Sequence, residues 1–253
     1  MIYDLQRASM WKRISAFLFD AILLSIVAVL LAWAMSGVLG YDEYSTSLDS
    51  AYARYGEEYG VDFNLSLQEY DSLNAEEREN LNNAYAALSD DPAAVSAYNM
   101  TIHLMLLITS LGLLSGFVLM EFLVPMKLGN GQTLGKKIFG LGLMQQDGIK
   151  VNGRVMFVRT ILGKYTLETM VPVLIVMMIW FGILGLIGTL VLAGILLVQL
   201  LMLAFTKNRL VIHDALAGTV TVDLASQMIF PDRASMIAYK ERIHAEQAAR
   251  EPY

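Results

Sequence analysis

The first hydrophobic run, from Ile14 to Leu39, most strongly constrains what this chain can fold into. It is 26 residues long and contains a single charged residue, Asp20. As a helix it would rise about 39 Å, enough to cross a hydrocarbon core of roughly 30 Å with some tilt. Arg13 stands at the edge of the run, where a cation reaches headgroups and water. A carboxylate inside the apolar zone is costly, so Asp20 is expected to face protein or water and to have a partner.

The composition of the whole chain is that of a membrane protein. Hydrophobic residues make up 56% and charged residues 17%, and the mean hydropathy is +0.50, values outside those of ordinary soluble domains. The absence of cysteine excludes disulfides, thiolate metal sites and cysteine nucleophiles. The first run is about twice as long as the apolar part of a signal peptide, and no cleavage pattern follows closely, so we expect an uncleaved signal-anchor helix.

Three further membrane spans are expected. Asp91-Pro92 predicts a helix N-terminus with proline in its first turn, and the helical pattern continues into a second span over residues 100–126. The stretch from Thr169 to Phe205 is apolar for 37 residues without a charge, which is too long for one helix. Its glycines favour a bend near residues 182–188, which divides it into two spans of about 167–184 and 188–205.

Charge is divided between two parts of the chain. Residues 40–99 hold 13 acidic and two basic residues, a net charge of −11, whereas residues 127–164 hold seven basic and one acidic residue, a net charge of +6. The positive-inside rule then makes the basic loop and both termini cytoplasmic and the acidic insert extracytoplasmic, in a multi-pass protein of the plasma (inner) membrane. Asn74 and Glu77 predict a capped helix in the insert. We interpret the insert as a solvated helical cap rather than a surface that concentrates cations.

The basic loop at 127–165 carries strand and helix patterns. Asp147-Gly148 separates two apolar stretches and predicts a β-hairpin between 138–144 and 149–151, with Thr219–Val222 as a third strand. An amphipathic helix is expected over 154–165. The glycine-rich motif lacks the spacing of a phosphate-binding loop, so we interpret it as a tight turn whose basic residues meet anionic headgroups; it consists of Gly131, Thr133, Gly135 and Lys136.

The predicted fold class is therefore an all-α integral membrane protein. Four transmembrane helices carry a small cytoplasmic layer of β-hairpin and loop and an acidic extracytoplasmic helical insert. The expected parts are an N-terminal interfacial segment with the first span (1–39), the insert (40–99), the second span (100–126), the basic loop (127–165), the third and fourth spans (166–205) and a cytoplasmic tail (206–253) with a surface helix near 233–250.

These motifs, taken in order, resemble the RDD family of membrane proteins, which is named for one arginine and two aspartates. Arg13 and Asp20 correspond to the arginine and aspartate of the first membrane helix, and the second aspartate corresponds to Asp214. The Gly131–Lys136 loop is similar to the family's glycine-rich loop, and Arg159 to a further basic residue after it. The resemblance implies a membrane-embedded fold and, as suggested for members of the family, transport of ions or small solutes. It does not extend to the 40–99 insert.

The charged residues of the predicted spans and tail allow two interpretations each. Arg13 and Asp20 form either a structural ion pair completed by Arg159, Arg209 or Lys136, or a titrating or ion-binding site. Glu121 and Glu168 either pair with Lys127 and Lys164 or form a three-carboxylate cluster with Asp20, of the kind that binds hard cations. For His213-Asp214 we favour a turn in which Asp214 caps the chain or pairs with Arg209 over a hydrolase dyad.

From these residues we expect transport of a cation or small solute, with proton coupling as an option. The alternative is a non-transporting accessory or scaffold protein whose charged motifs only hold the fold. The sequence contains neither a His-Glu-x-x-His zinc motif nor a nucleophile elbow, so we expect no enzyme activity, no metal site and no cofactor. The expected partners are the lipid bilayer, a monovalent cation or proton, and a second copy or another membrane protein, but no nucleic acid.

Overall fold

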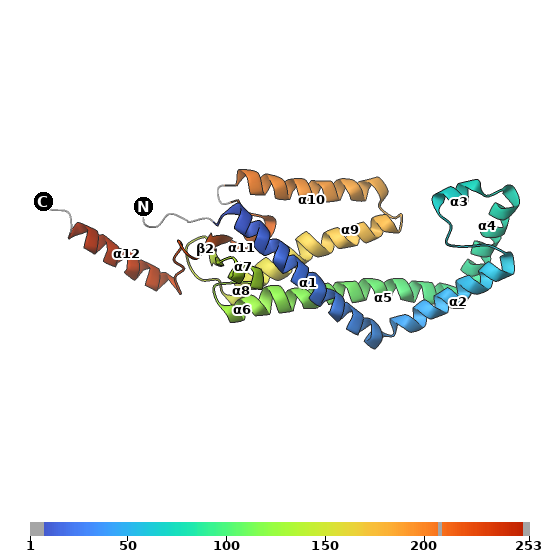
Figure 1. Cartoon of the computed structure of the whole chain (residues 1–253), viewed down its shortest axis with the longest axis horizontal. Helices are drawn as coiled ribbons and strands as arrows, with labels where there is room; N and C mark the ends of the chain where they lie inside the picture. The colour runs from blue at the N-terminus through green and yellow to red at the C-terminus, as the bar shows by residue number, and fades with distance from the viewer. Residues whose placement is uncertain (1–7, 207–208, 250–253) are drawn as a thin grey trace. The chain divides into compact units, whose positions relative to one another are not determined.

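The computed structural model describes residues 8–206 and 209–249, and these form two compact units. Unit 1 comprises residues up to Val29 and from Leu113 onward, and unit 2 comprises Leu30–Gly112. The part of the predicted N-terminal interfacial segment that precedes residue 8 lies outside the described residues. The order of helices and strands along the chain can be followed in Figure 1.

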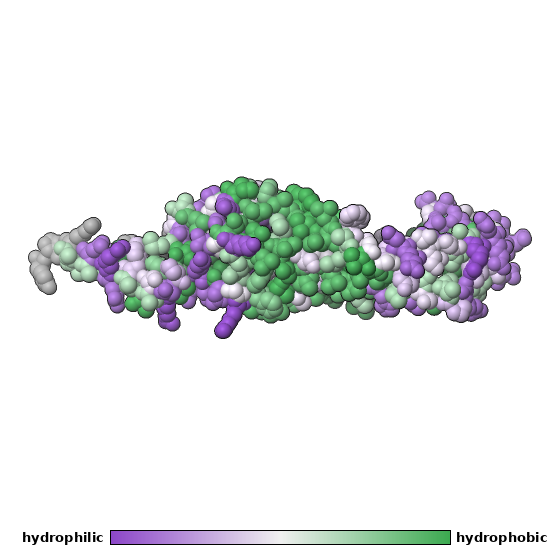
Figure 2. All heavy atoms as spheres, turned by 90° about the horizontal axis from the view of Figure 1, so that it is seen from below, coloured by the Kyte–Doolittle hydropathy of each residue, from purple (hydrophilic) through white to green (hydrophobic). Residues whose placement is uncertain are grey.

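Within residues 8–206 and 209–249, four helical stretches are long and apolar enough to cross a membrane, which confirms the predicted all-α membrane fold and its four spans. Few of their side chains are buried within the protein, as expected for helices that face lipid. Figure 2 shows hydrophobic side chains covering the spans of unit 1. The stretches are Met10–Leu39, Pro92–Leu128, Gly153–Trp180 and Gly185–Phe205.

The first span is the single helix α1 (Met10–Leu39), and the second is made of three joined helices. These are α5 (Pro92–Phe117), the π-helix η1 (Val118–Leu123) and α6 (Val124–Leu128). Asp91 begins the second span as predicted, since its Oδ1 accepts hydrogen bonds from the backbone of Ala93 and Ala94. Gly116 lets α5 approach α1, because a Cβ there would lie 3.2 Å from the Cβ of Ala28.

The third span corrects the predicted boundary at residue 166. The sequence suggested an amphipathic helix over 154–165 and a separate span from about 167. Instead α8 (Gly153–Phe157), the π-helix η2 (Val158–Met170) and α9 (Val171–Trp180) form one continuous helical stretch. The charged residues of η2 can belong to the span because each meets a partner inside the protein, as described below.

The fourth span, α10 (Gly185–Phe205), packs against α9 and returns beside it (Figure 1). The turn between them contains the two glycines Gly182 and Gly185 at φ values of 72° and 45°. Side chains rarely adopt this left-handed conformation, so the predicted glycine bend is where the 37-residue apolar run divides.

A two-stranded antiparallel sheet lies in unit 1; it confirms the predicted strand at Thr219–Val222 but corrects the second arm of the predicted hairpin. Strand β1 (Leu141–Gln145) pairs with β2 (Thr219–Asp223), so that Leu143 lies opposite Thr221. The arm at 149–151 turns back along β1, where Ile149 accepts a backbone hydrogen bond of 2.8 Å from Gln145, but it contributes only isolated bridges, from Lys150 to Met144 and from Ile149 to Phe230. Strands β1 and β2 are both almost completely buried and pair over five residues, whereas the arm is only three residues long.

Short helices connect the sheet to the spans. The glycine-rich loop leads into α7 (Leu134–Ile138), and the chain after α10 forms α11 (Ile212–Ala217) before β2. The surface helix predicted near 233–250 is α12 (Arg233–Ala248), which begins at Asp232, whose side chain accepts from the backbone of Ser235.

Unit 2 contains the acidic insert, which is helical. Its helices are α2 (Tyr41–Tyr59), α3 (Leu67–Ser72) and α4 (Ala75–Asp90). Asn74 caps α4 in a capping box with Glu77, as predicted. Helices α2 and α4 pack through small residues, with Ala84 fully buried. The insert therefore has a core of its own, and most of its carboxylates are exposed.

Candidate functional site

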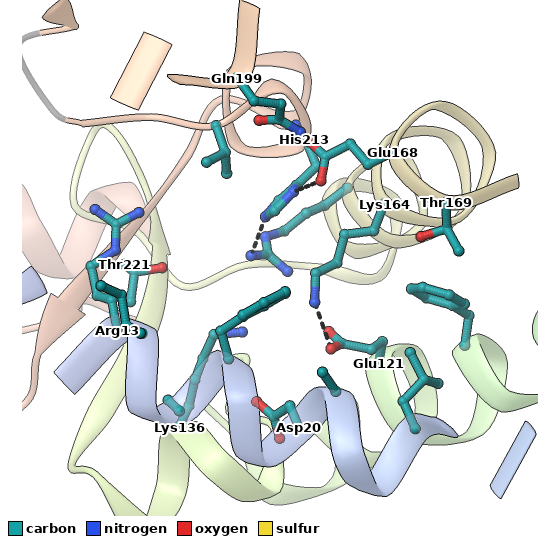
Figure 3. A pocket seen from close by; sticks show the side chains of 18 of the residues that line it. Arg13, Asp20, Glu121, Lys136, Lys164, Glu168, Thr169, Gln199, His213 and Thr221 are labelled. Atoms are coloured by element: carbon teal, nitrogen blue, oxygen red, sulfur yellow. Dashed lines mark hydrogen bonds and ion pairs between the residues drawn. The ribbon is translucent and has the colours of Figure 1, made fainter. Parts of the chain in front are cut away.

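A cavity of about 570 Å³ in unit 1 collects charged residues from distant parts of the sequence (Figure 3). Much of its lining is aliphatic and comes from α1, α5 and α10. Four basic and three acidic side chains also line it: Arg13, Lys136, Arg159, Lys164, Asp20, Glu121 and Glu168. Its volume is that of an ordinary small-molecule pocket.

Asp20 joins the first span to the glycine-rich loop. Its Oδ1 accepts a hydrogen bond of 2.7 Å from the backbone of Gly135, and its Oδ2 accepts one from the Thr133 hydroxyl. Thr133 in turn caps α7 by accepting from the backbone of Lys136. A Cβ at Gly135 would lie 2.4 Å from the carbonyl oxygen of Ala16, so only glycine allows this approach. The glycine-rich loop therefore supplies hydrogen-bond donors to both oxygens of the Asp20 carboxylate.

Arg159 and Asp214 form the most deeply buried ion pair of the site. Arg159 donates from Nε to Asp214 Oδ1 at 2.9 Å, and that oxygen also accepts from the Thr219 hydroxyl at 2.8 Å. Arg13 stands farther off, with Nη2 at 4.0 Å from Asp214 Oδ2. Burial would raise the pKa of Asp214, but Arg159 above all outweighs burial, so the pKa lies below its usual range. Asp214 is therefore ionised at neutral pH.

The ring of His213 is held from both sides. Its Nδ1 lies 2.7 Å from Glu168 Oε2, and its Nε2 lies 2.9 Å from Arg159 Nη2. An arginine can only donate, so Nε2 of His213 accepts a hydrogen bond from Arg159. The other ring nitrogen, Nδ1, is therefore protonated and donates a hydrogen bond to Glu168. Burial, and then the charge of Arg159, lower the pKa of His213, which agrees with a neutral ring.

Glu121 and Lys164 form a third contact, between η1 and η2. Lys164 donates from Nζ to Glu121 Oε1 at 2.5 Å, and the hydroxyl of Thr160 donates to the backbone carbonyl of Glu121 at 3.0 Å. The other carboxylate oxygen of Glu121 is buried without a hydrogen-bond partner among the described residues. One acceptor of the site is thus left open.

Lys136 differs from the other basic residues of the site. It is only 8% exposed, and within the described part of the chain its ammonium has neither a hydrogen bond nor an ion pair. Burial lowers its pKa to about 7, and the positive charge of Arg159 acts in the same direction. Lys136 is therefore the group of the cavity that changes charge near neutral pH.

The π-helix η2 explains how Arg159 and Glu168 reach the same histidine. Nine residues apart, they would lie on opposite sides of an α-helix, at 100° per residue. A π-helix bonds residue i to i+5 and has roughly 4.4 residues per turn, so nine residues complete about two turns and return to one face. A helical wheel drawn at the α-helical period therefore separates two residues that the structure joins.

Seven of the sequence-predicted residues line one cavity, but with partners other than those expected: Arg13, Asp20, Glu121, Lys136, Arg159, Glu168 and His213. Asp214, Arg209, Gly131, Thr133 and Gly135 do not line it. Arg13 donates to the backbone carbonyl of Arg209 at 3.1 Å, so the predicted Arg13–Asp20 ion pair is wrong, as is pairing of Asp214 with the Arg209 side chain. Lys136 points into the cavity rather than toward headgroups (Figure 3). Gly131, at a φ of 58°, packs against the Leu143 side chain.

The three-carboxylate cluster is also corrected. Asp20, Glu121 and Glu168 are bound respectively by the loop, by Lys164 and by His213. Among the described residues, no group of three or more His, Cys, Asp or Glu side chains is placed to hold a metal ion.

Two contacting residues were missed from the sequence. Gln199 on α10 accepts a hydrogen bond of 3.3 Å from the backbone of Ile212, and Thr219 binds Asp214. Gln199 carries the one amide side chain in the 37-residue apolar run, which is a signal that an intramembrane polar residue is used. Thr219 had no comparable signal, because threonine is common in strands.

Comparison with known proteins gave one match. The sequence model of the RDD family matches residues 7–218. The matched range contains every residue named above in this site except Thr219. Neither the comparison with curated proteins nor the comparison with solved structures gave a match.

Proposed function

Because the chain belongs to the RDD family of membrane proteins, we propose that its charged cavity carries a small solute across the bilayer and exchanges a proton at Lys136. One observation carries this proposal. The side chain of Lys136, which is 8% exposed and has no partner among the described residues, lines a ligand-sized cavity between membrane spans. Ionisable groups in such places are the usual elements of transport pathways.

A proton is favoured over a metal cation as the coupling ion. The carboxylates of Asp20, Glu168 and Asp214 already accept two or more hydrogen bonds each from the protein. Binding a metal cation would require breaking them. Lys136, whose pKa is lowered to about 7, can gain or lose a proton without such a rearrangement.

The alternative, a non-transporting scaffold, is favoured by the buried contacts that Arg159 and His213 make. The Arg159–Asp214 and His213–Glu168 contacts tie α11 and the third span together, which is a structural role. Under this alternative the burial of Lys136 would have no role in transport, and the rest of the fold would offset its cost. We propose no catalysis, since the His213 ring is occupied on both sides.

The charge asymmetry supports the orientation. With net charges of −11 in residues 40–99 and +6 in 127–164, we place both termini and the cavity's basic loop on the cytoplasmic side of the plasma membrane. Four helices leave little room for an enclosed pathway, so we place the protein in a homo-oligomer or beside a membrane partner.

Flux measurements in liposomes test the proposal. The purified protein is reconstituted with an internal pH dye, and monovalent cations and short organic anions are added against a pH gradient. We expect one class of solute to move protons, Lys136→Met to abolish the movement, and Lys137→Met, its exposed neighbour on α7, to leave it unchanged. Absence of solute-dependent proton movement from the wild type would favour the scaffold.

A further inference from the structure

The unpartnered groups of the cavity point to the chemistry of its ligand. Lys136 is more than nine-tenths buried, and Nη1 of Arg159 is buried without a hydrogen-bond partner among the described residues. A buried cation without a counter-charge is strongly unfavourable. An anion in the cavity would supply that counter-charge.

The carboxylates nearby make their direct contacts with other groups. Asp20 is bound by the glycine-rich loop, Glu168 is bound by His213, and one oxygen of Glu121 is bound by Lys164. Arg159 is paired with Asp214, which does not line the cavity, and Lys164 is paired with Glu121. Lys136 has no ion-pair partner among the described residues, and this favours a ligand with a single negative group.

The rest of the lining is hydrocarbon. Leu24 on α1, Leu113 on α5 and Leu200 and Leu203 on α10 line the same cavity as Lys136. These helices are membrane spans with apolar surfaces. A small hydrated anion would leave this surface without a partner, whereas an aliphatic chain would cover it.

We propose that the cavity binds a single-chain anionic amphiphile, whose carboxylate or phosphate group accepts hydrogen bonds from Lys136 and whose aliphatic tail packs on the leucines of α1, α5 and α10. This inference rests on the proposed function, because it names the solute class of the same cavity. A volume of about 570 Å³ suits one chain and one headgroup.

Binding should depend on pH through Lys136. The groups that face its ammonium are Asp20 on α1, Glu121 on η1, and Arg159 and Lys164 on η2. In the empty cavity burial lowers the pKa of Lys136 to about 7, so an anion binds the protonated form and competes with deprotonation above that pH. We expect the affinity to fall as the pH rises from 6 to 8.

The test uses the full chain in a neutral detergent after removal of bound lipid. Binding of dodecanoate, dodecyl phosphate, dodecanol, acetate and inorganic phosphate is measured by native mass spectrometry and by the rise in melting temperature. We expect dodecanoate and dodecyl phosphate to bind one per chain, and dodecanol, acetate and phosphate to bind at least about tenfold more weakly. This is the loss expected for one charge-assisted hydrogen bond or for the tail's burial.

Variants separate the headgroup from the tail. Lys136→Met should weaken dodecanoate binding about tenfold or more, and Lys137→Met should not. Leu203→Trp should fill the tail region and abolish binding, whereas Leu196→Trp, at a position 61% exposed on the same helix, should leave it intact. The Lys136→Met variant is expected to remain folded, because it removes a buried charge.

Three results would overturn the inference: dodecanol binding as tightly as dodecanoate, unchanged binding in Lys136→Met, or a two-chain phospholipid that dodecanoate fails to displace. Failure of the transport proposal is distinguishable. Dodecanoate binding that depends on Lys136, without proton movement in liposomes, would reject the transport proposal and support the amphiphile site. Proton flux that depends on Lys136, without amphiphile binding, would support the transport proposal and reject the amphiphile site.

Discussion

Arg159 donates to Asp214 across 2.9 Å although 55 residues separate them in the chain. Both side chains are almost fully buried, with exposed fractions of 3% and 2%. The pair connects the π-helix of the third span to the turn before β2. Removing one partner of such a pair leaves the other charge buried and uncompensated.

We expect Asp214→Asn to reduce the free energy of unfolding by about 3–5 kcal/mol. Because the pKa of Asp214 is depressed, its contribution should be constant above pH 5 and be lost as the pH falls below about 4. Thermal unfolding in detergent at several pH values measures both effects. Asp147→Asn, in an exposed turn, is the matched control and should change little. An Asp214→Asn protein as stable as the wild type would refute a structural role for the pair.

His213 should make the stability depend on pH in a higher pH range than Asp214 does. Burial and Arg159 lower its pKa in the folded protein, whereas in the unfolded chain its pKa is about 6.5. Below pH 6.5 the unfolded chain therefore binds a proton that the folded protein does not, so the melting temperature should fall between pH 7 and 5.

The variant His213→Asn keeps a donor near Glu168 and removes the titration, so its melting temperature should vary less over that range. His103→Asn, at an exposed position on α5, should reproduce the wild-type profile. Identical profiles for all three proteins would show that His213 does not titrate differently on folding.

Gly135→Ala tests the approach of the glycine-rich loop to the first span. The added Cβ would lie 2.4 Å from the Ala16 carbonyl oxygen and 2.9 Å from Asp20 Cγ, so the loop must move away from both. We expect a loss of about 1–3 kcal/mol in the free energy of unfolding. Gly153→Ala is the control, because its Cβ would meet only Met126 at 3.9 Å. Equal melting temperatures for the two variants would contradict the close approach.

The proposed orientation predicts which residues a membrane-impermeant thiol reagent can label. The chain contains no cysteine, so Ser47→Cys in the acidic insert and Ser235→Cys in the tail each report on one position. In intact cells Ser47→Cys should react and Ser235→Cys should react only after the membrane is opened. Reaction of both from outside would reverse the assignment of the termini.

The sequence predicted the spans better than the site, for a physical reason. Long apolar runs and the glycines at 182 and 185 act locally, and they correctly gave four helices and a bend. Charged residues inside a membrane protein choose partners by three-dimensional proximity. Arg13 and Asp20, seven residues apart on one helix, bind different segments, and Arg159 and Glu168 share a face only because η2 is a π-helix. Neither relationship can be predicted from the spacing of residues on an α-helix.

The sheet and Lys136 illustrate the same limit. Asp147-Gly148 forms the predicted turn, in which the backbone of Gly148 donates to the Gln145 carbonyl, yet the extended partner of β1 is a strand some 75 residues later. A lysine in a glycine-rich loop resembles a headgroup contact, since exposure is the normal state of lysine. Only the packing of Gly135 on α1 brings Lys136 into the cavity.

Asp20→Asn separates the transport and scaffold functions, because Asp20 is both a structural acceptor and a charge near Lys136. Asparagine keeps one oxygen for the backbone of Gly135 but removes the negative charge. The Asp20 carboxylate is one of the charges that oppose the lowering of the Lys136 pKa by burial. Without it that pKa should fall below about 7, so dodecanoate affinity and proton movement should reach half their maximum at a lower pH than in the wild type.

Thr133→Val is the matched control, since it removes the hydroxyl that binds Asp20 and leaves every charge in place. Both variants should lower the melting temperature, because each weakens the contact between α1 and the glycine-rich loop. Only Asp20→Asn should move the pH of half-maximal dodecanoate binding, measured by titration between pH 5.5 and 8.5. A shift of equal size in both variants, or a shift in neither, would mean that Asp20 acts on the cavity through structure alone, and the scaffold function would then account for it.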